Sequence, residues 1–446
     1  MARLSDLPDE LLVKILLYLP TKVAVSTSVL SKQWQFLWMW LPKLEYSNDP
    51  ESTILRDIVI RKRDYQQSKT LRKFIDKNLP LHRAPVIESL RLDFVFGNVL
   101  NVGPETIRRW VQISVSRCLR ELEISYISKT INIFPGSFYT CASLVILKLS
   151  FVNLMDVPLT GCLRSLKTLE LINFTYDQES LQRLLSICPV LEDLSVNLGH
   201  ANHDTVREFT IIVPSLRSLS FITPNYWPLD GYLIDTPSSE YFKLEDWNDR
   251  EHYGEIRNMP KLKEAYVDLF SYDLKSIIRS ITSAKRLTIC SKDDVSGDGF
   301  VFKHLEHLKL CGCKEDSSTF LGQLLQVSPN LRVLDICVLK DHNMDGDDDF
   351  MGFWNQPSRV PECLLSSLQI LNWSRYFGRP QEREIAVYIL KNACRLKKAT
   401  IWADTEYYVS NLEMIKELTL SSRASSTCEL VFVEDDTDRE PEPEAE

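Results

Sequence analysis

One hydrophobic pattern returns along most of the chain: Leu-x-x-Leu-x-Leu, in which x is any residue and another apolar residue replaces some leucines. The central copies follow one another at spacings of 25, 22, 25 and 25 residues. Each copy predicts a short strand, because alternate side chains of a strand point to opposite faces. A period of roughly 20 to 29 residues predicts stacked units that share one core and one parallel sheet. The thirteen copies, of which two are degenerate (Ser239 and Ala284), begin at Ile87, Leu119, Leu144, Leu166, Leu191, Leu216, Ser239, Leu262, Ala284, Leu305, Leu331, Leu368 and Leu396.

The polar positions between the strand leucines are expected to face away from the core, on the concave side of the stack. They mix both charges with an occasional tyrosine, which suits a protein or peptide ligand better than phosphate or lipid. Any solvated strand face also needs such residues, so a purely structural role for each of them stays open. The candidate target-binding residues are Glu123, Glu170, Asp193, Lys243, Tyr266 and Lys309.

The first forty residues follow a helical pattern instead. Residues 4–42 contain 22 apolar side chains and only six charged ones. The apolar stripe of Leu7, Leu11, Leu12, Ile15, Leu16 and Leu19 predicts a helix that has Pro8 in its first turn and stops at Pro20. A second short helix is expected over 22–30, and a third one is capped by Ser31. Three short helices cannot hide this many apolar side chains, so a partner or the rest of the chain must cover some of them.

The same residues resemble the F-box in its plant form. The segments that carry the resemblance are Leu7-Pro8-Asp9-Glu10-Leu11-Leu12, Ile15-Leu16, Leu19-Pro20, Ser28-Val29-Leu30-Ser31-Lys32 and Trp34 with Leu37-Trp38. An F-box implies binding to a Skp-type adaptor, which joins a cullin-RING ubiquitin ligase. By this resemblance, the residues that contact the adaptor or position such contacts are Leu7, Pro8, Leu11, Ile15, Leu19, Pro20, Val29 and Trp34. Val23 stands where the family often has an acidic residue and Gln33 where it often has a basic one, which weakens polar complementarity with the adaptor.

The remaining chain resembles two further plant modules. The Leu-x-x-Leu-x-Leu copies resemble plant leucine-rich repeats without a regular asparagine position, which implies a shallow, irregular horseshoe. Residues 354–433 resemble the FBD domain that accompanies F-boxes in plant proteins, through Val360-Pro361-Glu362-Cys363-Leu364-Leu365 and Tyr388-Ile389-Leu390. The expected elements of this domain are strands at 368–373, 396–402 and 428–433, with helices at 382–394 and near 411–418. Its strands would extend the repeat sheet and close the open end of the solenoid.

Charge and cysteine content narrow the possible functions. The formal net charge is −9, but residues 434–446 hold eight acids and one arginine, so the rest of the chain is nearly neutral. A nearly neutral body argues against nucleic-acid binding, which needs a basic surface. Eleven scattered cysteines favour a reducing compartment over a disulfide framework. We find neither a signal-peptide pattern nor an apolar run of roughly 18 residues. We therefore expect a cytoplasmic or nuclear protein, or one present in both, with no membrane contact and a disordered acidic tail.

One group of residues has the ligand types of a metal site. His304, His307, Cys311 and Cys313 are close in sequence, but Cys-x-Cys beside His-x-x-His lacks the spacing of common zinc modules. His307 and Cys311 project from one strand, so a small metal site is geometrically possible, although the sequence favours no metal and no cofactor. An acidic run at 341–349 lacks the glutamate that a calcium loop needs at its twelfth position. No common catalytic motif occurs. We expect no enzyme, and a hydrolase or metal enzyme that uses the histidine–cysteine group is an alternative.

Together these patterns predict an α/β protein with an N-terminal three-helix F-box, an irregular leucine-rich-repeat solenoid and a C-terminal FBD cap. The expected ranges are 1–45 for the F-box, 46–85 for a helical linker, 86–340 for the repeats, 354–433 for the FBD domain and 434–446 for the tail. The resemblance implies the substrate-recognition subunit of an SCF-type ubiquitin ligase, non-catalytic itself, which binds the adaptor through the F-box and a protein target through the repeats. The main alternative is an interaction scaffold that does not engage the ligase.

Overall fold

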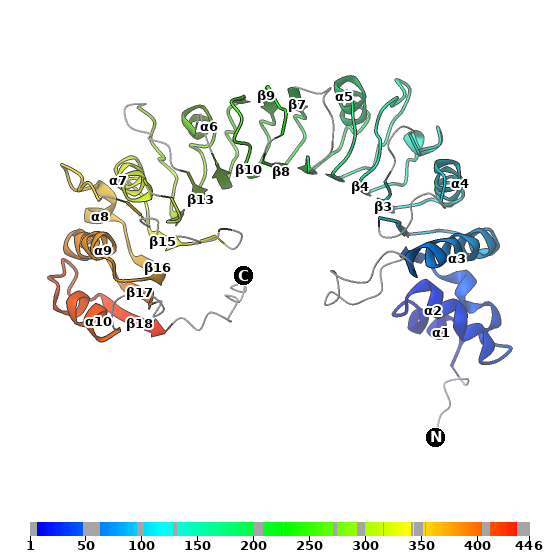
Figure 1. Cartoon of the computed structure of the whole chain (residues 1–446), viewed down its shortest axis with the longest axis horizontal. Coiled ribbons are helices and arrows are strands. Elements are labelled where there is room, and N and C mark those ends of the chain that lie inside the picture. The colour runs from blue at the N-terminus through cyan, green and yellow to red at the C-terminus, as the bar shows by residue number, and fades with distance from the viewer. Residues whose placement is uncertain are drawn as a thin grey trace. The chain divides into compact units, whose positions relative to one another are not determined.

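The structure is a computed structural model of the chain (Figure 1). It divides into two compact units, the N-terminal unit Met1–Asp230 and the C-terminal unit Gly231–Glu446. The boundary between them falls inside the predicted repeat region. The structure describes residues 7–47, 63–95, 102–127, 132–199, 208–225, 227–270, 274–291, 299–314, 316–339, 342, 351–352, 354–403 and 411–434.

A parallel sheet forms the framework of the N-terminal unit. Its strands follow the order β1-β2-β3-β4-β5-β6-β8. Their bounds are Lys43–Ser47, Ser89–Asp93, Glu121–Ser125, Ile146–Ser150, Thr168–Ile172, Asp193–Asn197 and Ser218–Thr223. The register aligns one leucine of each strand in a row that is at most 2% exposed, namely Leu44, Leu90, Leu122, Leu147, Leu169, Leu194 and Leu219. This row forms the core of the unit, because each leucine is covered by those of its neighbours.

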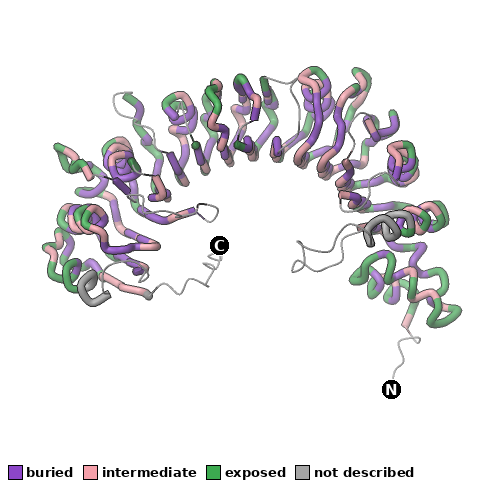
Figure 2. Tube along the Cα trace, viewed as in Figure 1, coloured by how far each residue is buried: buried purple, intermediate pink, exposed green. Residues whose placement is uncertain are grey.

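Helices cover one face of this sheet. Helices α4 (Pro104–Val115) and α5 (Gln178–Ser186) lie on the same side of the strands (Figure 1). The apolar stripe of α5 is buried, and the Asp177 side chain caps the helix by accepting a hydrogen bond from the Ser180 amide at 2.8 Å. The unit also contains α3 (Arg63–Asn78), the 3₁₀ helices η4 (Leu79–Leu81) and η6 (Phe138–Thr140), and β7 (Glu208–Ile212). We name the sheet face opposite the helices the open face. Figure 2 shows the alternation along the strands between buried residues and those that are half-buried or exposed.

The C-terminal unit repeats the same construction. Its strands form a parallel sheet in the order β10-β12-β13-β14-β15-β16-β17-β18, and β9 (Gly231–Asp235) pairs with β11 (Tyr253–Ile256) apart from it. The bounds of the sheet strands are Tyr241–Asp246, Glu264–Leu269, Arg286–Cys290, His307–Cys311, Val333–Cys337, Ile370–Tyr376, Lys398–Ala403 and Glu429–Glu434. The inward row that is at most 1% exposed contains Phe242, Ala265, Leu287, Leu308, Leu334, Leu371 and Ala399. Helices α6 (Leu274–Ser280), α7 (Ser317–Val327) and α9 (Pro380–Asn392) lie on one side of it (Figure 1).

The repeat prediction is confirmed strand by strand. Each of the thirteen copies gives a strand that begins two residues after its first position: β2 to β6, β8, β10 and β12 to β17. The two degenerate copies also form strands, β10 and β13, because the inward positions Phe242 and Leu287 keep the apolar alternation. The horseshoe curvature stays a prediction.

The linker region departs from the sequence prediction. Strand β1 spans the expected boundary between the F-box and the helical linker, and it pairs with β2 as the first strand of the sheet. Its sequence carries only two inward apolar residues, Leu44 and Tyr46, which is too short a pattern to recognise without its neighbour. Helix α3 occupies the later part of the linker. The expectations for the acidic run and for the acidic tail fall largely on residues 343–350 and 435–446, which lie outside the described residues.

The first two N-terminal helices form as expected, and the third does not. Helix α1 spans Asp9–Leu16, and α2 (Thr21–Ser26) continues into the 3₁₀ helix η2 (Thr27–Val29). The third segment, Trp34–Trp40, is the 3₁₀ helix η3, and Gln33 precedes it without a side-chain cap. The prediction of a helix capped by Ser31 is therefore wrong. Three tryptophans and a phenylalanine among its seven residues lower the preference for an α-helix, because large rings lose side-chain freedom there.

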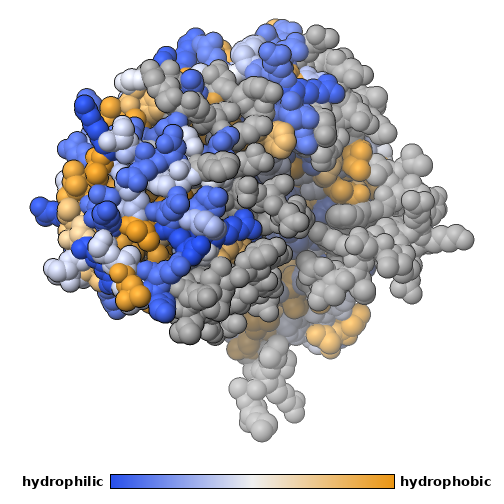
Figure 3. Space-filling view, turned by 60° about the vertical axis from the view of Figure 1, so that its left-hand side comes forward, coloured by the Kyte–Doolittle hydropathy of each residue, from blue (hydrophilic) through white to orange (hydrophobic). Residues whose placement is uncertain are grey.

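The C-terminal elements follow the expected order. Helix α8 (Glu362–Ser366) precedes β16, α9 lies between β16 and β17, and α10 (Asn411–Leu420) lies between β17 and β18. These strands extend the sheet beyond β15 by parallel pairing. Figure 3 brings the side with α7 to α10 forward, and its coloured surface intersperses hydrophilic and hydrophobic residues. Among the described residues, no helix is long and apolar enough to cross a membrane.

A buried carboxylate holds the start of α9. Glu382 is fully buried, and its Oε2 accepts hydrogen bonds from the amides of Phe377 and Arg379, both at 3.0 Å. Burial raises the pKa of Glu382 to about 7, although these hydrogen bonds oppose the rise. The loss of hydration therefore outweighs the two amide donors.

This raised pKa predicts a pH-dependent effect of Glu382→Gln. The folded state holds a proton that the unfolded chain releases between its ordinary pKa of 4.5 and about 7, so the stability that Glu382 contributes falls as the pH rises through this range. Glutamine keeps an oxygen acceptor without the charge. The stability of the variant relative to the natural chain should therefore increase by about 2 kcal/mol between pH 5 and pH 8. Urea unfolding at both pH values measures this change, with exposed Glu384→Gln as the control. A pH-independent difference would contradict the prediction.

Candidate functional site

The N-terminal helices expose an unusual number of large apolar side chains. Ten of the 21 exposed large hydrophobic residues of the described chain lie within residues 11–40. Isolated exposed hydrophobic residues are normal, but a concentration of them marks an interaction surface. We name these ten the N-terminal apolar set: Leu11, Ile15, Leu17, Tyr18, Leu19, Val23, Val29, Leu30, Phe36 and Trp40.

Helix α1 shows how the set arises. The sequence predicts one apolar stripe on this helix, and the structure divides the stripe between two sides. Leu12 and Leu16 are fully buried, whereas Leu11 and Ile15 are 44% and 37% exposed. Adjacent helical residues differ by about 100° in direction, so one apolar pair packs inward while the other faces water. The inward pair fixes the helix, and the outward pair is available to a partner.

The predicted adaptor residues take different positions in this module. Leu11, Ile15, Leu19 and Val29 are exposed and belong to the N-terminal apolar set. Pro8 and Pro20 are exposed at the N-terminal ends of α1 and α2, and Leu7 is half-buried. Trp34 is only 7% exposed, so in this structure it packs inside the module and can only support the contacts of other residues.

Gln33 has a role that the sequence analysis missed. Its Nε2 donates to the backbone oxygen of Leu7 at 3.1 Å and to Oδ1 of Asp9 at 3.2 Å. The side chain therefore fastens the entry to α1 to the segment before η3. No local pattern reports this contact, because the partners are 24 and 26 residues apart in sequence.

The N-terminal module is attached directly to the repeat sheet. The Thr21 hydroxyl accepts a hydrogen bond from the Glu45 amide at 2.8 Å, and the Met39 carbonyl accepts from the amides of Arg83 and Ala84. His82 Nε2 lies 2.6 Å from the Leu41 carbonyl oxygen, and burial lowers the pKa of His82. Some of the excess apolar residues, such as Met39 and Leu41, are thus buried on the same chain. The ten residues of the N-terminal apolar set, in contrast, remain exposed.

The open face of the N-terminal unit carries a row of alternating charges. Arg91 of β2 pairs with Glu45 of β1 and with Glu123 of β3, both at 3.1 Å. In the same register, Lys148 of β4 pairs with Glu170 of β5 at 3.5 Å. Burial raises the pKa of Glu123, and the positive charges of Arg91 and Lys148 only partly offset it. Two predicted target-binding residues, Glu123 and Glu170, therefore lie in this row. Asp193 is exposed in the neighbouring row of the same face.

The open face of the C-terminal unit holds the other predicted target-binding residues. Lys243 Nζ lies 5.0 Å from the centre of the Tyr266 ring and 2.8 Å from a Glu245 oxygen. Lys309 is half-buried on β14 and lies opposite Asp335 of β15. Lys243 and Tyr266 contact each other, and Lys309 stands beside an acidic residue in the register. This arrangement is compatible with both a structural role and a binding role.

The histidine–cysteine group predicted from sequence has the wrong members. His307 pairs with Asp335 at 2.6 Å, and about 13 Å of strand separates it from Cys311. Burial of Asp335 opposes its ionisation, but the hydrogen bonds from His307 and Asn372 outweigh this and lower the pKa of Asp335.

The structure instead gathers Cys290, Cys311, Cys313 and His342. Hydrogen bonds with Asp268 and two of the cysteines raise the pKa of His342 to about 12, and hydrogen bonds with the other two thiols hold the pKa of Cys311 well below its usual range. Cys290 had a sequence signal, because β13, β14 and β15 all end in cysteine after the same alternation. His342 had none, since its position depends on a contact 52 residues away in sequence.

Three family models match separate parts of the chain. The F-box domain matches residues 4–46, the LRR repeats of FBD-associated F-box protein At5g56370 match 107–263, and FBD matches 356–401. The order of these matches agrees with the order predicted from the sequence, and the F-box match ends inside β1.

Several curated proteins are similar over nearly the whole chain. The chain is 57% identical over 424 residues to FBD-associated F-box protein At5g38590 of Arabidopsis thaliana, covering 94% of this chain and 98% of that protein. It is 54% identical over 435 residues to FBD-associated F-box protein At4g10400 of the same plant, covering 97% and 100%. It is also 44% identical over 450 residues to Putative F-box/FBD/LRR-repeat protein At5g62970 of A. thaliana, covering 95% and 98%.

Proposed function

The chain belongs to the plant family of FBD-associated F-box proteins with leucine-rich repeats, and from this premise we propose that it is the substrate-recognition subunit of an SCF-type cullin-RING ubiquitin ligase. In this proposal the N-terminal module binds a Skp-type adaptor, which links the chain to the cullin and the RING protein. A protein target binds elsewhere on the chain, in the cytoplasm or the nucleus.

The observation that carries the proposal is the N-terminal apolar set. Leu11, Ile15, Leu19 and Val29 combine an F-box position with exposure to water, so the residues that the family resemblance assigns to the adaptor are available for contact. Covering them with an apolar surface would stabilise the complex by about 25 cal/mol for each Å² of apolar area removed from water. The inward partners Leu12 and Leu16 hold this surface in place without taking part in the contact.

The chain would act through position. A bound target held near the ubiquitin-conjugating enzyme experiences a high effective concentration of the activated ubiquitin. The chain needs only two binding surfaces that can be occupied together. No residue of the chain needs to take part in bond making or breaking, in agreement with the family names, which point to an adaptor-type protein.

The adaptor surface can be tested in the full-length chain. The double variant Leu11→Ala, Val29→Ala truncates one exposed side chain in α1 and one in η2. Because neither side chain is buried, the variant should fold like the natural chain. We expect a loss of about 2 kcal/mol in binding to a Skp-type adaptor, or roughly 30-fold in Kd. Leu159→Ala is the matched control, because Leu159 is 78% exposed in the same unit but outside the N-terminal apolar set. Isothermal titration calorimetry with the purified adaptor measures all three affinities.

Two results would contradict the proposed surface. One is an unchanged adaptor affinity in the double variant. The other is a natural chain that is folded but does not bind the adaptor at all, which would favour the interaction scaffold that does not engage the ligase.

For the target we propose the open faces of the two units. The supporting observation is their composition, in which charged side chains of both signs and a tyrosine stand in register on neighbouring parallel strands. The proposed contact residues are Glu123, Glu170, Asp193, Lys243, Tyr266 and Lys309. Ion pairs that water reaches, such as half-buried Lys148 with Glu170, are worth at most about 1 kcal/mol, so these side chains can be exchanged without unfolding the sheet.

A pair of variants tests the open face and identifies the target in the same experiment. In plant cells that lack the natural chain, proteins that accumulate with the Leu11→Ala, Val29→Ala variant but not with the natural chain are the candidate targets. A variant with Glu170→Ala, Asp193→Ala and Lys309→Ala should cause the same proteins to accumulate while binding the adaptor normally. Quantitative proteomics measures both sets. Normal turnover of every candidate in the open-face variant would contradict this surface.

A further inference from the structure

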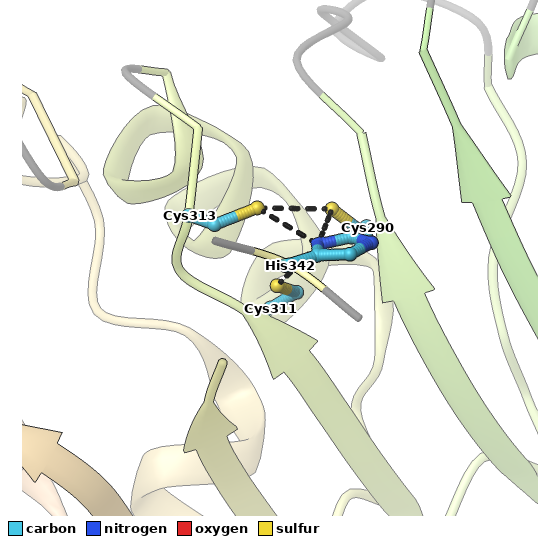
Figure 4. A group of neighbouring side chains, drawn as sticks. All are labelled: Cys290, Cys311, Cys313 and His342. Carbon is cyan, nitrogen blue, oxygen red and sulfur yellow. Dashed lines mark hydrogen bonds between the residues drawn. The ribbon is translucent and has the colours of Figure 1, made fainter. Parts of the chain in front are cut away.

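Four side chains with metal-binding atoms meet at one point of the C-terminal unit. They are Cys290, Cys311, Cys313 and His342, and one ligand atom from each lies within 4.8 Å of the other three (Figure 4). Cys290 and Cys311 are the last residues of β13 and β14, Cys313 follows β14, and His342 belongs to the chain after β15. The histidine reaches the sheet from a segment about 30 to 50 residues away from the cysteines in sequence.

The alternation of the strands makes this burial unusual. Leu287 and Ile289 of β13 point inward, so Cys290 lies on the open face, and Cys311 of β14 lies there for the same reason. Both cysteines are nevertheless fully buried. The covering residues include Leu339 and His342, which follow β15, and the His342 amide donates to the Leu339 carbonyl at 3.0 Å. The chain after β15 is thus folded back over the open face at the carboxyl ends of the strands.

The distances fit tetrahedral coordination of one ion. His342 Nδ1 lies 3.1 Å from the sulfur of Cys313, 3.4 Å from that of Cys311 and 3.6 Å from that of Cys290. The sulfurs of Cys290 and Cys313 are 3.5 Å apart. In a regular tetrahedron with Zn–S near 2.3 Å and Zn–N near 2.0 Å, the edges are about 3.8 Å between sulfurs and about 3.5 Å between sulfur and nitrogen. The four ligand atoms therefore already stand close to the spacing that zinc imposes.

Hydrogen bonding alone does not account for this convergence. One imidazole nitrogen can share a single proton, yet three thiol sulfurs point toward His342 Nδ1 (Figure 4). A nucleophilic cysteine would need one thiol beside the histidine and access for a substrate. Here two of the three sulfurs belong to fully buried residues.

The other ring nitrogen is held as in many zinc sites. His342 Nε2 lies 2.8 Å from Oδ2 of Asp268, which is 2% exposed, and Trp247 Nε1 donates to the same oxygen at 2.9 Å. A carboxylate on the far nitrogen of a ligand histidine fixes the orientation of the ring and leaves the near nitrogen free to coordinate. Asp268 is the register partner of Cys290 on the neighbouring strand, so the sheet itself sets this geometry.

We propose that Cys290, Cys311, Cys313 and His342 bind one Zn²⁺ ion in a closed, structural site. Three sulfurs and one imidazole are ligands that zinc prefers, and four protein ligands leave no position for a catalytic water. Coordination needs three thiolates and a neutral imidazole, so the protons that these four groups hold in the free protein pass to solvent, and the coordinated group has a net charge of −1.

This site would support the proposed target-binding surface. Tyr266 packs against the cysteine cluster, and its ring also contacts Lys243. The ion would join the ends of β13 and β14 to His342, which follows β15. It would thereby hold in place the part of the open face that lies beside Tyr266. It would have no part in adaptor binding, so its test does not depend on the ligase role.

Metal analysis of the full-length protein tests the proposal. Protein expressed with added zinc and purified under reducing conditions without chelators should contain about one zinc per chain, measured by inductively coupled plasma mass spectrometry. Cys311→Ser and His342→Ala should each lower this to less than about a fifth. Cys337→Ser is the matched control, because Cys337 is buried in the same cluster, opposite Cys311 on β15, but is not one of the four ligands. It should keep its zinc.

Two further measurements test the proposal even if a ligand variant fails to fold. One loads the natural chain with Co²⁺, and the other uses a variant of Asp268, which contacts His342. The natural chain reloaded with Co²⁺ should show the thiolate charge-transfer and d–d absorption of tetrahedral coordination. Asp268→Asn should retain the site with zinc affinity lowered about 10- to 100-fold, measured by competition with a chelating dye. The proposal is overturned by natural protein that neither retains zinc nor gives the cobalt spectrum, by equal zinc loss in Cys337→Ser, or by bound iron or copper in place of zinc. A Cys290–Cys313 disulfide in freshly purified protein would overturn it as well.

Discussion

The structure depends on the mutual burial of one inward side chain per strand. In the N-terminal unit this row contains a leucine from each of β1 to β6 and β8, and in the C-terminal unit it runs from Phe242 to Ala399. A single copy of the repeat cannot bury its own leucine, because the side chains that cover it belong to the copies on either side. Parallel pairing in a constant register is what brings them together, so the sheet and the core form at the same time.

This constraint also explains how the binding surfaces are distributed. A strand at the end of such an array has a neighbour on one side only, so residues outside the repeats must cover its inward side chain. At the start, β1 continues from the N-terminal module, whose Met39 and Leu41 pack on the chain while Leu11 and Val29 remain exposed. In the C-terminal unit the last strands of the sheet are β16 to β18, and the FBD match covers β16 and ends within β17. The strand positions between the inward residues are free to carry charge, which gives the open faces. The proposed adaptor surface and the proposed target surface thus lie on different parts of the chain, the first on the N-terminal helices and the second on the strands.

The sequence predicts the strands far better than it predicts the site at their ends. All thirteen copies become strands, because the Leu-x-Leu alternation is local and is enforced by every neighbour. The 3₁₀ form of Trp34–Trp40 is missed, since an i, i+3, i+4 apolar pattern does not separate it from an α-helix. Cys290 could have been found because β13 and β14 both end in cysteine after the same alternation, but His342 could not, because only the fold brings it to residues of β12, β13 and β14. His307 was wrongly grouped with Cys311 because the two residues are close in sequence. They lie on the same strand, but at its two ends, so their side chains do not meet.

Hydrogen–deuterium exchange of the full-length chain, with and without a Skp-type adaptor, most directly tests the claim that adaptor and target surfaces are separate. The account predicts that the adaptor slows exchange in peptides that cover α1, α2 and η2, and leaves β3 to β6 and β12 to β15 unchanged. Slowed exchange in the strands of the open faces, or no change in the N-terminal helices of a chain that binds the adaptor, would contradict it.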